Sequence, residues 1–145
     1  MKPYPPIVFG TGLLVAFIGH QLWPLSMPDS WWVRVGGAVL IVAAAVLALL
    51  TERAFHRART PVLPFKDATT LITTGPMRIS RNPIYLAFSI ATIGIAPVVG
   101  SWWPLIPLPL VLMVMTRIIR GEEVRLQRLF GDAFTAYCAR TRRWL

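Results

Sequence analysis

Cysteine and acidic residues are both scarce in this chain of 145 residues. The single cysteine, Cys138, excludes an intrachain disulfide, and no Cys/His pattern around it suggests a metal site. Only six residues are Asp or Glu, and charged residues make up 14% of the chain against 55% hydrophobic residues. With a mean hydropathy of +0.59, this composition is wrong for a soluble domain of that length. We therefore expect one domain, residues 1–145, with the lipid bilayer as its solvent.

The basic residues are numerous but lie almost entirely in two polar stretches. The formal net charge of +9 would suggest a nucleic-acid partner in a soluble protein. Fourteen of the fifteen Lys and Arg residues, however, fall before the first apolar run, between the second and third, or from Arg117 onward at the end of the fourth run and after it. Only Arg34 falls elsewhere. The positive-inside rule explains this distribution without nucleic acid and places both termini in the cytoplasm.

Four apolar runs predict an all-α membrane protein with four transmembrane helices. We expect spans at about residues 7–23, 31–50, 83–100 and 102–119, a cytoplasmic loop at 51–82 and a cytoplasmic segment at 120–145. The third and fourth spans are joined so tightly that they must form an antiparallel hairpin. Their prolines predict kinks, at Pro97 in the third and at Pro104, Pro107 and Pro109 in the fourth.

Several smaller patterns fit this topology. Five tryptophans flank the two connections at the outer face, as in an aromatic belt. His20 lies near that face and His56 in an extension of the second helix, so neither is favoured as a catalytic residue. After the fourth span, apolar residues recur at helical spacing and predict an amphipathic helix that lies on the bilayer or packs on the loop. We expect Gly131 to weaken or break that helix.

The stretch 74–86 combines turn formers, cations and a helix start. We expect Asn82 to cap the third helix through its side chain, with Pro83 in the first helical position. A helix N-terminus beside Arg78 and Arg81 is suited to a carboxylate or a phosphate. The simpler interpretation is a capped helix with positive-inside arginines. Spacing alone does not separate the two.

Two adjacent carboxylates, Glu122 and Glu123, follow the fourth span at the same face. Neighbours on a helix point about a hundred degrees apart, so they cannot have the same role. Glu122 can pair with Arg125, which would leave Glu123 facing the mid-chain loop, or the roles can be exchanged. A surface salt bridge is the simpler alternative here.

These two motifs resemble the small integral-membrane methyltransferases that include isoprenylcysteine carboxyl methyltransferase and the phospholipid methyltransferases. The residues that carry the resemblance are Gly75-Pro76-Met77-Arg78, Ser80 to Leu86, Arg120-Gly121-Glu122-Glu123, Leu126, Phe130-Gly131, Tyr137 and Arg142 to Leu145. The resemblance implies S-adenosylmethionine bound at the cytoplasmic face of the membrane and a lipophilic or lipid acceptor that enters from the bilayer.

The resemblance also implies roles for individual residues. Arg81 and the Asn82-Pro83 helix start would hold the cofactor carboxylate, Glu122 or Glu123 its hydroxyls or ammonium, and Tyr85 its sulfonium. The full expected set is catalytic Glu122, Glu123 and Arg120, and cofactor-binding Gly75, Pro76, Arg78, Arg81, Asn82, Pro83, Tyr85 and Glu123. No protein nucleophile is needed, because the acceptor attacks the methyl group directly.

The expected protein is therefore a methyltransferase of the bacterial inner membrane that contacts membrane lipids and no nucleic acid. A non-enzymatic four-helix membrane protein, such as a small transporter subunit or a scaffold, is the alternative. A transporter should carry ionisable groups at mid-membrane, whereas here they gather at one rim. A membrane-tethered nucleic-acid binder would need no paired carboxylates at a helix exit, and it is the least favoured reading.

Overall fold

The computed structural model describes residues 4–59 and 70–145, and it confirms an all-α architecture with four helices. The helices are α1 (Pro5–Leu22), α2 (Trp31–Arg57), α3 (Pro83–Val99) and α4 (Leu108–Arg140). Two short 3-10 helices, η1 (Gly75–Arg78) and η2 (Trp103–Leu105), precede α3 and α4. The part of the predicted loop at 60–69, including Lys66, lies outside the described residues, as does Lys2.

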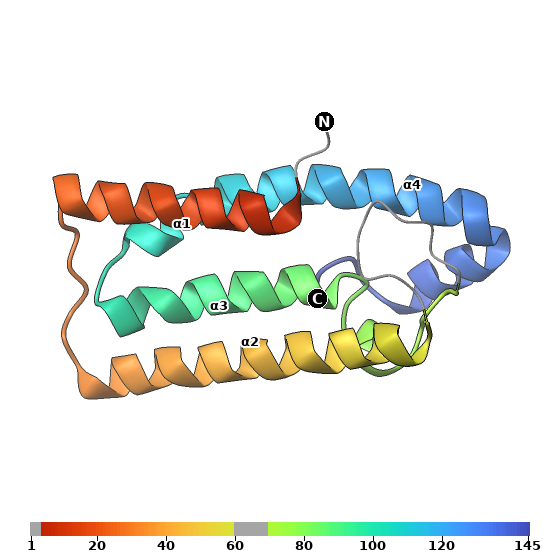
Figure 1. Cartoon of the computed structure of the whole chain (residues 1–145), viewed down its shortest axis with the longest axis horizontal. Helices are drawn as coiled ribbons and strands as arrows, with labels where there is room; N and C mark the ends of the chain where they lie inside the picture. The colour runs from red at the N-terminus through yellow and green to blue at the C-terminus, as the bar shows by residue number, and fades with distance from the viewer. Residues whose placement is uncertain (1–3, 60–69) are drawn as a thin grey trace.

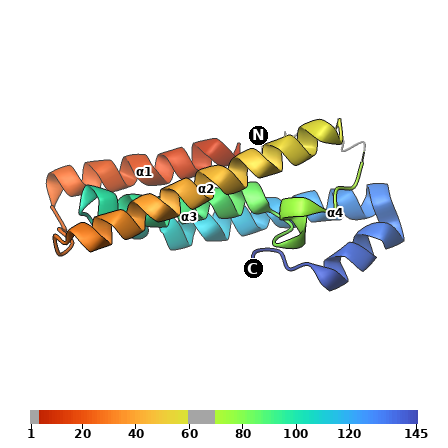
Figure 2. The same cartoon turned by 90° about the horizontal axis from the view of Figure 1, so that it is seen from below.

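The four helices run roughly alongside one another in an elongated bundle, with α3 between α2 and the α1–α4 pair (Figures 1 and 2). In the described part of the chain, α1, α2 and the helical stretch Trp103–Arg140 are long and apolar enough to cross a membrane. Helix α3 is apolar but has only 17 residues, the lower limit for a span. Its predicted bounds of 83–100 agree with the observed ones within one residue.

Glycines allow α2 and α3 to approach closely. A Cβ atom added at Gly37 would lie 2.6 Å from the carbonyl oxygen of Gly94, and one added at Gly94 would lie 2.7 Å from that of Gly37. Gly36, which the sequence also offered as a packing residue, has nothing within 4 Å of such an atom. Gly37 is therefore needed for this packing and Gly36 is not. Small residues at helix contacts commonly allow such close approach in membrane proteins.

The predicted prolines of the fourth span do not kink it. Pro104 lies in η2, Pro107 is the N-cap of α4, and Pro109 lies in its first turn. A backbone N–H at these positions would have no acceptor within the helix, so proline is tolerated there without bending the helix. The helix therefore starts later than expected and is not kinked. Pro97 differs from these prolines, because it lies in the interior of α3, near its end and far beyond its first turn.

Helix α4 continues without interruption from the membrane span into the predicted C-terminal segment. It changes direction at Gly131, whose φ of 50° and ψ of −125° are not helical, and the following turns fold back toward the bundle (Figure 1). The predicted break at Gly131 is confirmed. The apolar face after it packs on the mid-chain loop, with Phe134 and Tyr137 buried against Met77.

The connections at one end of the bundle hold each other and carry the aromatic residues. Trp102 N–H donates to the Leu25 carbonyl, and the indole of Trp103 donates to the Trp23 carbonyl at 2.7 Å. His20 Nδ1 contacts Ser101 Oγ at 3.0 Å at this end. The end of α2, residues 70–82, the start of α3 and the end of α4 gather at the opposite end of the bundle (Figure 1).

Candidate functional site

The part of the mid-chain loop around Gly75 to Arg78 is fixed by a turn and by one buried hydrogen bond. Gly75 has a φ of 62°, in the left-handed region that favours glycine, and it starts η1. Met77 is buried in η1, and its carbonyl accepts a 2.7 Å hydrogen bond from Tyr137 Oη. Burial raises the pKa of Tyr137 to about 12. The loop is therefore held by the part of α4 that folds back.

The start of α3 is not capped in the way we predicted. Asn82 is the N-cap, and its carbonyl accepts the Leu86 N–H, but its side chain makes no capping hydrogen bond. The Asn82 amide Nδ2 instead donates to the Arg143 carbonyl at 3.0 Å, and the Asn82 N–H donates to Ser80 Oγ. The side-chain capping prediction was wrong because this distant carbonyl competes successfully for the Asn82 amide.

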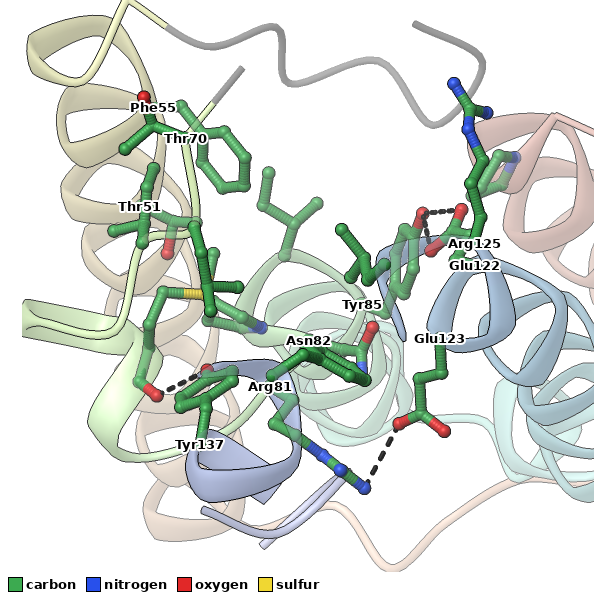
Figure 3. A pocket seen from close by; sticks show the side chains of 18 of the residues that line it. Thr51, Phe55, Thr70, Arg81, Asn82, Tyr85, Glu122, Glu123, Arg125 and Tyr137 are labelled. Atoms are coloured by element: carbon green, nitrogen blue, oxygen red, sulfur yellow. Dashed lines mark hydrogen bonds and ion pairs between the residues drawn. The ribbon is translucent and has the colours of Figure 1, made fainter. Parts of the chain in front are cut away.

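A cavity of about 290 Å³ opens between the end of α2, the start of α3 and the α4 region around Glu122 (Figure 3). The volume is near the lower end of the range for small-molecule sites. Thr51 and Phe55 of α2 face Tyr85, Glu122 and Arg125 across it (Figure 3). The remaining lining residues are Tyr4, Pro5, Pro6, Thr70, Leu71, Ile72, Met77, Arg81, Asn82, Pro83, Ile84, Phe88, Glu123, Leu126, Leu129, Phe134 and Tyr137.

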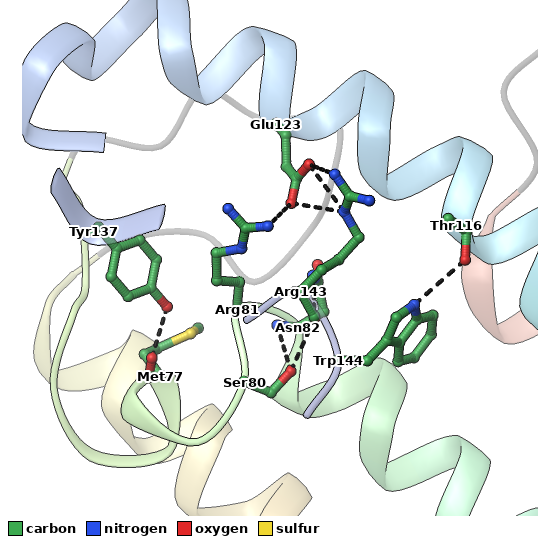
Figure 4. Close-up of polar contacts among 9 residues, drawn as sticks. All are labelled: Met77, Ser80, Arg81, Asn82, Thr116, Glu123, Tyr137, Arg143 and Trp144. Atoms are coloured by element: carbon green, nitrogen blue, oxygen red, sulfur yellow. Dashed lines mark hydrogen bonds and ion pairs between the residues drawn. The ribbon is translucent and has the colours of Figure 1, made fainter. Parts of the chain in front are cut away.

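Glu123 is held between two arginines (Figure 4). Arg81 Nη2 lies 3.1 Å from Glu123 Oε1, and the side chains of these two residues are only 13% and 15% exposed. Arg143 approaches the same carboxylate with Nη2 at 2.6 Å and Nε at 3.0 and 3.1 Å. These hydrogen bonds raise the pKa of the Arg143 guanidinium. The sequence left open which of the two glutamates faces the mid-chain loop. It is Glu123, because it contacts Arg81 of that loop.

Arg81 retains an unused donor. Its Nε atom is buried and has no hydrogen-bond partner within the described residues. A buried donor without a partner is costly, so a group that binds there and accepts a hydrogen bond would be stabilised. This atom belongs to a residue that lines the cavity.

Glu122 accepts a hydrogen bond from Tyr85 Oη, at 3.1 Å to Oε1 and 3.4 Å to Oε2 (Figure 3). Tyr85 is on α3 and Glu122 on α4, so this bond joins the two helices at the cavity wall. Both residues are half-buried. The adjacent glutamates thus differ in that Tyr85 donates to Glu122, whereas Glu123 contacts the two guanidinium groups of Arg81 and Arg143.

The structure brings most of the predicted site residues together. Those that line the cavity are Arg81, Asn82, Pro83, Tyr85, Glu122 and Glu123. Four do not line it, namely Gly75, Pro76, Arg78 and Arg120, and of these Gly75, Arg78 and Arg120 are exposed. Gly75 and Pro76 instead form the turn and 3-10 helix that precede the site.

Sequence reasoning missed two contributions to this site. The wall formed by Thr51 and Phe55 follows from the extension of α2, which was predicted without a role in the site. The interaction of Arg143 with Glu123 was not predicted at all. Arg143 belongs to a basic run from Arg140 to Arg143, and the charge pattern does not indicate which member folds inward.

Comparisons with known proteins identify the family of this chain. The model of the phospholipid methyltransferase family matches residues 32–133, which include both motifs of the cavity. A nickel-cobalt-cadmium resistance protein, NccN, of Alcaligenes xylosoxydans xylosoxydans is 26% identical over 136 residues. That alignment covers 93% of this chain but only 59% of the relative. No solved structure matches. With apolar helices long enough to span a bilayer and a family match over most of its length, this integral membrane protein belongs to the phospholipid methyltransferase family of membrane methyltransferases.

Proposed function

We propose that the protein transfers a methyl group from S-adenosylmethionine to a lipophilic or lipid acceptor at the cytoplasmic face of the membrane. The observation that carries this proposal is the cavity itself. It joins Arg81, just before α3, and Tyr85 of α3 to Glu122 of α4, opposite the wall formed by Thr51 and Phe55. Charged groups together with many apolar lining residues suit a polar cofactor and an apolar acceptor.

The cavity residues fit S-adenosylmethionine, which supplies a methyl group activated by a positively charged sulfur. The unpartnered Arg81 Nε and its guanidinium charge suit a carboxylate. Glu122 offers carboxylate oxygens for an ammonium or for ribose hydroxyls, and the Tyr85 ring offers a π face for a cation. Asn82 and Pro83 contribute the positive end of the α3 dipole on the same side as Arg81.

The acceptor's proton also needs a destination. When the acceptor is an amine, thiol or alcohol, its proton must leave as the new bond to the methyl carbon forms and the methyl–sulfur bond breaks. Glu122 is the better base of the two glutamates, because Glu123 is held by Arg81 and Arg143. We assign proton acceptance to Glu122. Arg120 is exposed outside the cavity, so we give it no contact with the reacting groups.

The distribution of charge favours an enzyme over a transporter subunit or scaffold. The acidic and basic side chains that line the cavity lie outside the predicted spans, before residue 83 or after residue 119, and the predicted cytoplasmic face has most of the cations. A transporter would need such groups near the membrane centre. The positive-inside distribution of the cations also favours an inner-membrane location with both termini in the cytoplasm.

A methyl-transfer assay tests the proposal. Protein in lipid nanodiscs is incubated with S-adenosylmethionine labelled with tritium in its methyl group, together with a total lipid extract. We expect label in the organic phase for the intact protein and for Arg128→Gln, which removes an exposed arginine away from the cavity. Glu122→Gln should reduce the rate roughly 100-fold, as expected for a general base. Absence of transferred label with the intact protein would contradict the proposal.

A further inference from the structure

The segment that follows α4 runs along the loop before α3 and is bonded to it through the backbone. The Arg142 carbonyl accepts the Arg81 N–H at 3.0 Å. The Arg143 carbonyl accepts hydrogen bonds from the Ser80 hydroxyl at 3.1 Å and from Asn82 Nδ2 at 3.0 Å (Figure 4). These bonds fix the position of Arg143 independently of its side chain, so a substitution there need not release the segment.

The two arginines around Glu123 do not contact it equally. Arg143 approaches the carboxylate with two nitrogens and three short distances, the fork geometry that gives the strongest guanidinium pairs. Arg81 makes a single contact of 3.1 Å. An incoming anion could therefore displace Glu123 from Arg81 more easily than from Arg143.

The charges around Glu123 also do not balance. Two guanidinium groups share this carboxylate, which leaves one positive charge over. Of the two arginines, Arg81 lines the cavity and Arg143 does not. The other charged residues of the cavity wall, Glu122 and Arg125, have opposite signs and add no net charge. The excess charge is therefore available at Arg81, next to its unpartnered Nε.

We propose that Arg143 is a positioning residue for the cofactor site. By holding Glu123, it leaves Arg81 with a charge and a donor for the carboxylate of the amino-acid part of S-adenosylmethionine. This inference rests on the proposed function. Without Arg143, Glu123 would pair with Arg81 alone and compete with the ligand's carboxylate.

Two ligands that differ in the amino-acid part separate this role from a general loss of structure. S-adenosylhomocysteine has the carboxylate, whereas 5′-methylthioadenosine has the same nucleoside and a thioether but no amino acid. Calorimetry would measure their binding to nanodisc protein. Arg143→Gln should weaken the affinity for S-adenosylhomocysteine roughly tenfold or more, which is the effect of one lost charged contact. The affinity for methylthioadenosine should stay unchanged. Arg140→Gln, an exposed arginine of the same region, serves as the matched control.

A double variant gives the sharpest result. In Arg143→Gln/Glu123→Gln the competing carboxylate is also neutral, so most of the lost affinity for S-adenosylhomocysteine should return. A merely structural role for the Arg143–Glu123 pair predicts no recovery. If Arg143→Gln does not fold, Arg143→Lys is the second variant, because it keeps the charge but not the fork geometry. It should weaken the affinity for S-adenosylhomocysteine several-fold and leave the affinity for methylthioadenosine unchanged.

The outcomes are distinguishable. Equal weakening of both ligands, unchanged affinity in Arg143→Gln or Arg143→Lys, or no recovery in the double variant would each overturn the role of Arg143. If the intact protein binds neither ligand, the proposed function falls as well.

Discussion

The close approach of α2 and α3 predicts a large difference between two adjacent glycine substitutions. In Gly37→Ala, the new Cβ would lie 2.6 Å from the Gly94 carbonyl oxygen and 2.6 Å from Pro97 Cγ. Since neither a backbone oxygen nor a proline ring can rotate away, the helices must separate. Such overpacking costs about 1–3 kcal/mol, partly offset by about 1 kcal/mol from the better helix propensity of alanine.

Gly36→Ala is the matched control, because nothing lies within 4 Å of its added Cβ. It should be neutral, or stabilising by up to about 1 kcal/mol. We therefore expect Gly37→Ala to be less stable than Gly36→Ala by about 1–3 kcal/mol. Reversible unfolding in mixed detergent micelles, followed by circular dichroism, would measure the difference. Equal stability of the two variants would refute the close α2–α3 packing.

Two further predictions concern the part of α4 that folds back. Tyr137→Phe removes the hydrogen bond to the Met77 carbonyl and should lower stability by about 1 kcal/mol near neutral pH. Because the folded-state pKa is raised from 10.0 to about 12, the neutral phenol contributes fully below pH 10 and its contribution is lost as the pH rises to 12. Unfolding at several pH values should therefore show the gap between the intact protein and Tyr137→Phe closing over that interval, and a constant gap would contradict this. Gly131→Ala should destabilise by about 1–3 kcal/mol, because its φ of 50° and ψ of −125° are unfavourable for alanine although the space is open. Thermal unfolding would measure this, and an unchanged midpoint would show that the turn does not need glycine.

The helices could be predicted because the signals that determine them are local. Hydropathy located the helices, and a glycine inside a helical pattern located the break at Gly131. The start of α4 was misplaced because proline was taken as a kink within a span. Pro107 and Pro109 instead occupy the N-cap and first turn, where the missing N–H has no cost.

The site was predictable only in part because its decisive contacts are not local. Asn82 was expected to cap its own helix, but its partner is the Arg143 carbonyl, 61 positions away. Glu123 bonds to Arg143 over 20 positions, which no helical spacing rule covers. The motifs indicated which chemical groups meet, whereas the fold determines how they are paired.

The most direct test of the central claim is whether S-adenosylhomocysteine reaches Arg81. Nuclear magnetic resonance of nanodisc protein labelled with ¹⁵N-arginine can follow the Arg81 Nε–H signal, which is identified by its absence in Arg81→Lys. We predict that S-adenosylhomocysteine shifts this signal in a saturable manner and leaves the signal of exposed Arg128 in place. Saturable binding that does not move the Arg81 signal, or no binding at all, would contradict the account.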